Sequence, residues 1–233
     1  MDNSILEGLL DKQERVTVAD QIYQQTRQLL MSGAVPPGEK ITLRGLAAAL
    51  NTSPMPVREA VNKLVAEGAL EMLPSRGLRV PKPSLPKFRE IVRIRCCLEG
   101  FAAAEAVKVI SDETVARIER HAHEFDKLGH QRKIDTLKTI EANRNLHFTL
   151  YEAAAMPLLV TMIENIWLQI APLFSLSMSS KDRKSESWES FSHHDALLAA
   201  LRRRDAEGAR DAVVADISDA AAYIEKTGNL ANT

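Results

Sequence analysis

Residues 41–60 read ITLRGLAAALNTSPMPVREA, and their pattern predicts the fold of the first third of the chain. The spacing of its apolar residues predicts a short helix over 43–50, with Thr42 as the N-cap whose hydroxyl accepts a backbone N–H. After a polar break, a second helix begins at Ser53-Pro54, where proline is tolerated because the first N–H groups of a helix have no intrahelical partner. Two helices joined by so short a turn are typical of a helix-turn-helix motif.

The flanks of this motif extend the pattern on both sides. Val18, Ile22 and Leu29 lie at helical spacing and predict an amphipathic helix before it. Short strand candidates at 70–73 and 78–80 surround a Pro-Ser-Arg-Gly turn, as in a β-hairpin. This order predicts a winged helix-turn-helix. The N-terminus of its third helix is expected to offer free N–H groups and a positive dipole end, which suit phosphates.

The chain changes in character after a proline-rich linker around Pro83. Six amphipathic stretches follow without a convincing strand, at roughly 86–109, 112–128, 133–154, 157–178, 187–203 and 206–226. They predict a helix bundle. We therefore expect a mainly α protein. It has a winged helix-turn-helix domain over 1–82, in which 1–16 form a flexible arm, and an all-α six-helix bundle over 83–233.

Composition excludes several classes of protein. Of the 233 residues, 45% are hydrophobic and 26% are charged, which excludes a disordered or collagen-like chain. The sequence shows no apolar run near the roughly 18 residues of a membrane span, and its N-terminus lacks the pattern of a signal peptide. The only two cysteines, Cys96 and Cys97, are adjacent and make poor disulfide partners. We expect core or interface thiols in a cytoplasmic protein that does not contact a membrane.

Charge is distributed unevenly along the chain. The net charge is −1, but residues 42–82 carry six Lys or Arg against three Asp or Glu, whereas residues 83–233 carry 20 against 22. A basic block beside a neutral to acidic one is compatible with a nucleic-acid-binding domain joined to a second domain. Ordinary solvated faces show the same excess, so charge alone does not decide the function.

Four blocks of the sequence match one family: ITLRGLA at 41–47, SPMPVREA at 53–60, LVAEGAL at 64–70 and SRG at 75–77. With them the first domain resembles the winged helix-turn-helix of the GntR superfamily. The helical remainder resembles the effector-binding FCD domain of the FadR-like branch, and six helices rather than seven resemble its shorter, VanR-like variant. The resemblance implies a homodimeric bacterial transcription regulator, a repressor or an activator, and no enzyme.

The resemblance also implies a set of DNA-contacting residues, in the second helix, around the start of the recognition helix and at the wing tip: Arg44, Thr52, Ser53, Arg58, Arg76 and Gly77. Arginine can pair with two acceptors of guanine, and glycine lets the backbone approach DNA closely. The other interpretation is that these arginines are solvated surface charges. Many relatives carry an arginine where this chain has Pro54, so one contact is missing and the operator sequence does not transfer. The expected partner is double-stranded DNA with an inverted repeat, one half-site for each subunit.

Polar side chains interrupt the apolar faces of three predicted helices in the second domain. Asn143 and His147 are four residues apart and share a helix face. His194 lies 11 residues before the predicted turn at Asp205, and Asp216 lies 11 residues after it. Because a helix rises about 1.5 Å per residue, His194 and Asp216 are expected at the same height of an antiparallel hairpin, facing each other.

These four side chains, Asn143, His147, His194 and Asp216, offer two nitrogen and two oxygen donors. Such a set suits a divalent transition metal such as zinc or nickel. A buried hydrogen-bond network without metal explains the same pattern. Metal-binding members of the family use an aspartate, a histidine four residues later and two further histidines. This chain has Asn143 where they have the aspartate and Asp216 where they have a histidine. One carboxylate is kept, and a divalent metal is the predicted cofactor.

Arg95 lies on an apolar helical stripe and needs a carboxylate partner. Glu99, one turn later, is one candidate. The resemblance implies another, a small organic acid held between Arg95 and the metal. Trp167 and Gln169 either line the same pocket or belong to the core and the surface.

The sequence therefore predicts a regulator whose operator affinity changes when a small carboxylate binds the helical domain. A metal-free pocket around the same residues is the first alternative. A metalloenzyme with a two-histidine, one-carboxylate site is the second, but no further carboxylate or histidine is an evident general base, and the winged domain would have no role. His130 and His193 have no evident partner in the sequence.

Overall fold

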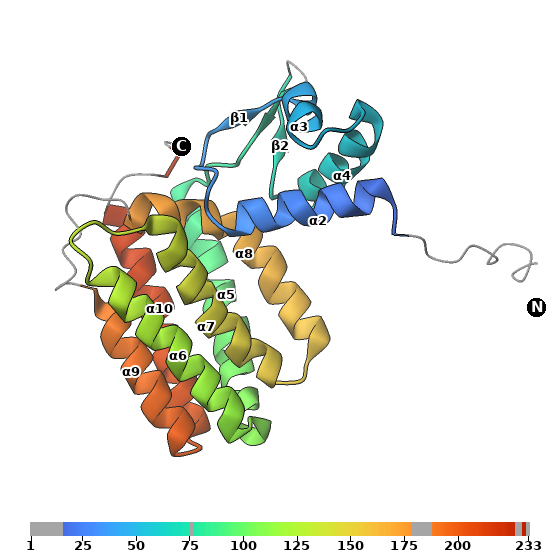
Figure 1. Cartoon of the computed structure of the whole chain (residues 1–233). Helices are drawn as coiled ribbons and strands as arrows, with labels where there is room; N and C mark the ends of the chain where they lie inside the picture. The colour runs from blue at the N-terminus through green and yellow to red at the C-terminus, as the bar shows by residue number, and fades with distance from the viewer. Residues whose placement is uncertain (1–15, 75–76, 179–187, 227–229, 232–233) are drawn as a thin grey trace, which may run out of the picture.

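The computed structural model describes residues 16–74, 77–178, 188–226 and 230–231. Within them the chain is mainly α-helical, as predicted, with one small antiparallel sheet in the N-terminal region (Figure 1). The predicted arm lies outside these residues apart from its last residue, and so does Arg76 at the predicted wing tip.

The N-terminal elements form a winged helix-turn-helix. In chain order they are α2 (Val18–Met31), β1 (Lys40–Ile41), α3 (Leu43–Ala49), α4 (Pro54–Ala66), β2 (Glu71–Met72) and β3 (Leu78–Arg79). The sheet has the order β1-β3-β2, with Arg79 opposite both Lys40 and Glu71. The strand β1 is an addition to the predicted elements, because two residues are too few to show an alternating pattern.

Capping residues explain where these helices begin. Thr17 and Asp20 form a capping box at the start of α2, in which each side chain bonds the backbone of the other residue. Thr42 caps α3, as predicted, by accepting a backbone N–H at 2.9 Å. Ser53 occupies the N-cap position of α4, but its side chain makes no capping hydrogen bond. The start of α4 therefore relies on the fixed φ angle of Pro54.

The C-terminal elements form a bundle. They are α5 (Leu85–Val109), α6 (Asp112–Gly129), α7 (Thr136–Ala153), α8 (Pro157–Met178), α9 (Glu189–Arg202) and α10 (Ala206–Lys226). Helix α5 packs against α10, α6 against α7, and α9 against α10. Figure 1 shows the α9–α10 hairpin on one side of α6 and α7, and α8 on the other side, below α2. The hairpin turns at Asp205, as predicted.

A continuous apolar core runs through the bundle and into the winged region, and Trp167 and Tyr151 are its largest fully buried side chains. Helix α8 contributes strongly to it. Its segment Pro157–Ser175 has a mean hydropathy of 1.4 and is, by length and composition alone, apolar enough to cross a membrane. This corrects the expectation that the chain has no such run. Half of the segment is buried inside the bundle, which explains its composition as that of a core helix.

Helix α2 joins the winged region to the bundle (Figure 1). It packs against α4 and against α8. On the α8 side, Arg27 Nη2 lies 3.1 Å from both Glu164 Oε2 and Asn165 Oδ1. A second bond crosses the junction directly, because Gln169 Nε2 of α8 donates to the carbonyl of Glu67 at 3.2 Å. Glu67 is the C-cap of α4, so these contacts hold the predicted recognition helix against α8.

Candidate DNA interface and metal centre

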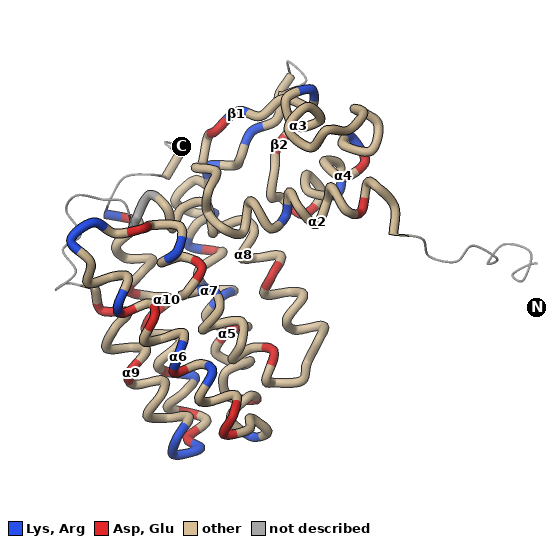
Figure 2. Tube along the Cα trace, viewed as in Figure 1, with Lys and Arg blue, Asp and Glu red and all other residues tan. Residues whose placement is uncertain are grey.

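The predicted DNA-contacting residues lie on consecutive elements of the winged region. Arg44 is exposed on α3, Thr52 is half-buried in the turn, and Ser53 is exposed at the start of α4. Arg58 is exposed on α4, and Gly77 immediately precedes β3. Figure 2 shows Lys and Arg on α3, on α4 and along the strands. Exposed cations on two successive helices are what contact with the phosphate backbone requires.

The N-terminus of α4 is poor in backbone donors. Pro54 and Pro56 occupy the first and third positions of the helix and have no N–H, so only Met55 keeps a donor among the first three. The two prolines therefore reduce the set of free N–H groups expected here. Among the first three helical positions only the N–H of Met55 remains, beside the hydroxyl of Ser53, which no capping bond occupies.

A cavity of about 380 Å³ opens beside Arg58. Its other lining residues are Leu43 of α3, Val61 and Asn62 of α4, and Met72 of β2. Asn62 is exposed and lies one turn after Arg58, and its amide carries the donor and acceptor that pair with adenine in the major groove. Asn62 is not among the DNA contacts that the resemblance implies, and its spacing of four from Arg58 places both residues on one face of α4.

Three of the four predicted metal ligands come together in the bundle, from α7, α9 and α10. His147 Nε2 lies 3.2 Å from Asp216 Oδ2, and His194 Nε2 lies 4.0 Å from the same oxygen. Ligand atoms of the three side chains lie within 4.8 Å of one another, and all three are buried. Asn143 is half-buried one turn before His147 on α7. The structure thus places His194 opposite Asp216 across the α9–α10 hairpin.

A hydrogen-bond chain determines which nitrogen of His147 carries a proton. The Tyr151 hydroxyl donates to Glu99 Oε2 at 2.6 Å, and the same hydroxyl oxygen lies 3.1 Å from His147 Nδ1. Because a hydroxyl has one proton and this one goes to Glu99, His147 Nδ1 is the donor to Tyr151. In neutral His147 the lone pair of Nε2 then faces an oxygen of Asp216. Two acceptors in contact need a cation or an additional proton between them.

Further polar atoms around this point are buried without a partner. Within the described part of the chain, both ring nitrogens of His194 and Oδ1 of Asp216 make no hydrogen bond. Buried polar atoms are nearly always satisfied, so three of them in one place indicate a missing ligand. Two imidazoles and a carboxylate suit zinc, nickel or a similar ion and leave coordination positions for water or a small molecule. The residues present therefore fit a divalent transition metal.

Electrostatics favour the protonation states that bind a metal. Burial lowers the pKa of His194 to about 4, so its imidazole is neutral at neutral pH. Burial alone would raise the pKa of Asp216. The hydrogen bond that His147 donates when its Nε2 carries a proton, and the positive charge of a protonated histidine, outweigh this effect, so the pKa of Asp216 lies well below its usual range. A neutral imidazole and an ionised carboxylate coordinate a metal without first losing a proton.

Arg95 is paired within the protein. Its guanidinium donates twice to Glu99, from Nε to Oε1 at 2.6 Å and from Nη2 to Oε2 at 3.2 Å, and both side chains are buried. The rings of Trp167 and Phe174 lie against the guanidinium, with centroids 5.0 and 5.6 Å from Cζ. Of the two partners predicted for Arg95, the structure shows Glu99. Trp167 borders the cluster, whereas Gln169 faces α4.

Several contacts near the cluster were not evident from the sequence. Tyr151 joins the two polar groups of the site, and its position four residues after the histidine of α7 is the signal that points to it. His193, without an evident partner in the sequence, pairs with Asp219 through Nε2 and Oδ2 at 2.6 Å. His130 stacks on Phe191 with ring centroids 4.5 Å apart. Both pairs join residues of different helices or turns, which spacing along the chain does not reveal.

A winged helix-turn-helix fixed to a helical bundle with a buried polar site is the architecture of a bacterial transcription regulator. Residues 18–80 match the bacterial regulatory proteins of the gntR family, and residues 90–219 match the FCD domain. The chain therefore belongs to the GntR family, in its FadR-like branch with an FCD domain. This confirms the predicted family, the predicted fold class and the prediction of a regulator rather than an enzyme.

Individual relatives agree with this assignment. The HTH-type transcriptional regulator McbR of Escherichia coli strain K12 is 31% identical over 199 residues, which cover 85% of this chain and 89% of that protein. The HTH-type transcriptional repressor RspR of the same strain is 25% identical over 202 residues, covering 87% and 86%. The solved structure of E. coli McbR/YncC matches with a TM-score of 0.83 at 28% identity, covering 92% of this chain and 100% of that one. A structure from Rhodococcus sp. RHA1 shares the fold, with a TM-score of 0.71 at 18% identity, covering 89% and 97%.

Proposed function

We propose that this regulator is a cytoplasmic homodimer whose affinity for an inverted-repeat operator changes when a small organic acid binds a metal centre in the bundle. DNA binding belongs to 1–82, and effector binding and dimerisation belong to 83–233. The observation that carries the proposal is the buried cluster of His147, His194 and Asp216 with its unpaired polar atoms. The VanR-like subgroup remains a prediction.

His147, His194 and Asp216 would hold the metal, and Asn143 would be a weaker fourth ligand. When bound, the metal supplies positive charge and open coordination positions on which a carboxylate can bind. Arg95 would border the effector with its guanidinium, two of whose donors bind Glu99. Glu99 holds that guanidinium in place, so the effector would meet a preformed site.

The DNA contacts would follow the family pattern. Arginine side chains of α3 and α4 would reach base edges or phosphates, the turn residues would bind phosphate, and the wing tip would lie in or near the minor groove; the residues are Arg44, Thr52, Ser53, Arg58, Arg76 and Gly77. The exposure of Arg44, Ser53 and Arg58 supports this assignment. Because Pro54 replaces an arginine, the operator would differ from that of relatives that keep it.

Exposed apolar side chains on α5 and α8 support a homodimer. Phe101 of α5 is 46% exposed, and Leu158 and Met162 of α8 are 76% and 46% exposed. The two helices pack against each other, so these side chains belong to neighbouring elements. Large exposed apolar groups on neighbouring helices are typical of an interface with another chain.

Helix α8 links the two proposed sites. Trp167 lies against His147 and Arg95, while Glu164, Asn165 and Gln169 contact α2 and the end of α4. A ligand that shifts α8 at Trp167 would therefore shift the support of the recognition helix. Coupling between two distinct sites through one shared element is what allosteric control of DNA binding requires.

The first experiment measures metal content by mass spectrometry on untagged protein, beside His194→Ala and the exposed control His130→Ala. We expect about one equivalent of a transition metal in the parent and in the control, and none in His194→Ala. Operator DNA selected from a random pool is then titrated by fluorescence anisotropy, with and without small chelating acids. No metal after incubation with zinc, nickel and manganese would contradict the metal centre. An operator affinity that no acid changes would contradict effector control.

A further inference from the structure

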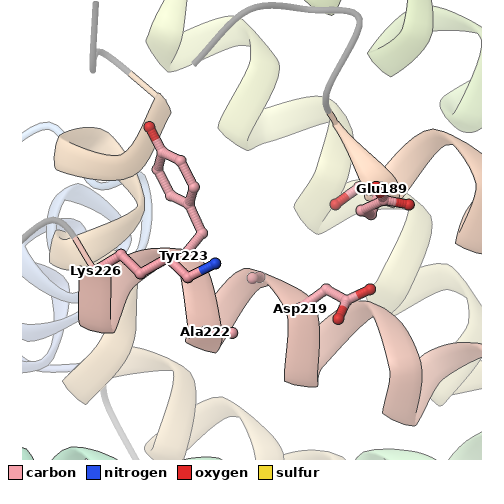
Figure 3. A pocket seen from close by; sticks show the side chains of 7 residues that line it. Glu189, Asp219, Ala222, Tyr223 and Lys226 are labelled. Carbon is pink, nitrogen blue, oxygen red and sulfur yellow. The ribbon is translucent and has the colours of Figure 1, made fainter. Parts of the chain in front are cut away.

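A groove lies on the surface of the α9–α10 hairpin (Figure 3). It encloses about 280 Å³. Both helices contribute its walls: Glu189, Ser190, Asp219, Ala220, Ala222, Tyr223 and Lys226. None of these residues belongs to the predicted metal, effector or DNA sites, and the groove has no role in the function proposed above.

Helix geometry makes the groove a continuation of the metal cluster. His194 of α9 faces Asp216 of α10 in the antiparallel hairpin. Ser190 precedes His194 by four residues, and Ala220 follows Asp216 by four residues. Residues four apart lie on the same face of a helix, about 6 Å apart along its axis. The floor of the groove is therefore one helical turn from the cluster, on the same faces that carry two of its ligands.

Burial increases from the rim of the groove to its floor. Glu189, Asp219 and Lys226 are exposed and Tyr223 is half-buried, whereas Ser190 is 9% exposed. Figure 3 shows Glu189 and Asp219 on the two helices toward one end of the groove, and Tyr223 and Lys226 further along α10. The groove thus has two carboxylates and one ammonium group at its rim in solvent, and a buried hydroxyl at its floor, one helical turn from His194.

Aromatic side chains cover other sides of the cluster. The ring of Phe125 lies 4.9 Å from that of His194. The rings of Trp167 and Tyr151 lie 6.1 and 5.9 Å from that of His147. All three side chains are fully buried, so an ion on these sides would have to cross the packed core. The α9–α10 side is where a polar route from solvent comes within one turn of the ligands.

We propose that this groove is the port through which a divalent transition-metal ion reaches the buried cluster. The carboxylates of Glu189 and Asp219 collect the ion at the rim, and Ser190 forms the floor over which it passes to His194 and Asp216. Asp219 is held in position by His193. Carboxylates gathered at one opening raise the local concentration of cations and the rate at which they enter. The inference rests on the proposed metal centre. It concerns the rate at which the ion reaches the buried ligands, and the ligands alone do not determine that rate.

The test measures how fast zinc loads into the metal-free protein, by stopped-flow competition with a fluorescent zinc indicator. In the double variant Glu189→Gln/Asp219→Asn we expect the loading rate constant to fall about threefold to tenfold at low salt. The difference shrinks at high salt, because salt screens exposed charges. The equilibrium dissociation constant for zinc stays unchanged. The matched control is Glu207→Gln/Asp211→Asn, which removes the same charge from exposed positions near the other end of α10.

A second variant tests the path itself. Ser190→Leu fills the floor of the groove, and we expect it to slow zinc loading and chelator-driven zinc release by the same factor, while Ser190→Ala does neither. Circular dichroism and the melting temperature verify that each variant is folded.

Loading at the parental rate in both the double variant and Ser190→Leu would overturn the port and leave the metal centre standing. A weaker zinc affinity in the double variant would overturn it too, because its carboxylates would then be ligands. A parent protein that binds no zinc would remove the metal centre, and the port with it.

Discussion

Glu99 and Arg95 form a buried pair whose charges cancel inside the bundle, and Tyr151 extends the pair to His147. An acid that enters the site finds Arg95 already bound by two hydrogen bonds. Direct pairing with Arg95 would require it to displace Glu99, whereas the metal would offer open positions at no such cost. At the scale of residues, the chemistry of the site therefore favours anchoring of the effector on the metal.

Substitution of Glu99 by glutamine tests this pair. Glu99→Gln leaves Arg95 buried without a counter-charge, and we expect a loss of about 3 kcal/mol in the free energy of unfolding, measured by urea denaturation. Added acetate should restore part of the loss, since the freed guanidinium would then bind a carboxylate. The control Glu225→Gln removes a partner of exposed Arg89 and should cost less than about 1 kcal/mol. Equal losses in the two variants would contradict the importance of burial here.

His194 gives the metal-free protein a pH dependence. Its pKa in the folded state is lowered to about 4, from 6.5 for an ordinary histidine, because burial disfavours the charged form. The unfolded chain therefore binds a proton first as the pH falls. The stability that His194 contributes is complete above pH 6.5 and is lost as the pH falls through about 4. For this fully buried group the loss is about 3 kcal/mol.

The measurement for His194 is urea denaturation of chelator-treated protein across this pH range. The parent should lose stability toward acid more steeply than His194→Gln, which keeps a polar side chain but has no proton to bind. Parallel curves for the two proteins would show that His194 is not desolvated in the metal-free fold. Zinc should raise the stability of the parent near neutral pH and make its loss toward acid steeper, because the metal keeps the folded imidazole unprotonated while the unfolded chain still binds protons.

Part of this site could be predicted from the sequence because it depends on helix geometry alone. His194 and Asp216 lie at equal distances from one turn, so their meeting follows from the rise of a helix. The contact of Tyr151 with Glu99 depends on how α5 packs against α7, which no spacing along the chain determines. The pairing of Arg95 stayed open for a related reason, because a buried carboxylate and a bound acid satisfy the same arginine.

The helices of the winged region differ in the capping interaction at their first residues. Thr42 was predicted as a cap and makes its bond, whereas Ser53 stands in the N-cap position of α4 without one. The prolines of α4 explain this difference. An N-cap side chain ordinarily accepts a hydrogen bond from the backbone N–H of the second or third helical residue. Pro56 is the third residue of α4 and has no N–H. At the scale of elements, local signals predicted the helices well. The strand β1 was not predicted, because two residues are too few to show alternating hydrophobicity.

The two caps give a prediction about stability and DNA affinity. We expect Thr42→Ala to lower the free energy of unfolding by about 1 kcal/mol, because it removes a capping bond. Ser53→Ala should change it by less than about 0.5 kcal/mol, because no bond is lost. The same Ser53→Ala should weaken operator binding in an anisotropy titration, if its free hydroxyl holds a phosphate. A large loss of stability in Ser53→Ala with unchanged operator affinity would show that the serine is a cap and not a contact.

The junction between the winged region and the bundle was beyond sequence reasoning. Arg27 and Glu164 are far apart along the chain, and each looks like an ordinary surface residue of an amphipathic helix. Gly33 shows how closely the two regions fit. A Cβ atom there would come within 3.0 Å of the Ala171 carbonyl oxygen and of a methyl group of Ile140. Contacts this tight would let a change in the bundle reach the proposed recognition helix, because packed interfaces shift between discrete arrangements instead of deforming smoothly.

Gln169→Ala tests this transmission in the whole molecule. The bond from Gln169 to the Glu67 carbonyl joins α8 to the end of α4, and neither residue is among the proposed metal ligands or the proposed DNA contacts. We therefore expect the variant to bind zinc and operator DNA separately with nearly parental affinity. Zinc together with the effector acid should change the operator affinity of this variant by a factor close to one. The reason is that the Gln169–Glu67 contact contributes the coupling free energy between the two sites. The control Thr161→Ala removes an exposed hydroxyl of α8 that bonds only within its own helix. A full response in Gln169→Ala would place the coupling elsewhere, in Arg27 or in the dimer.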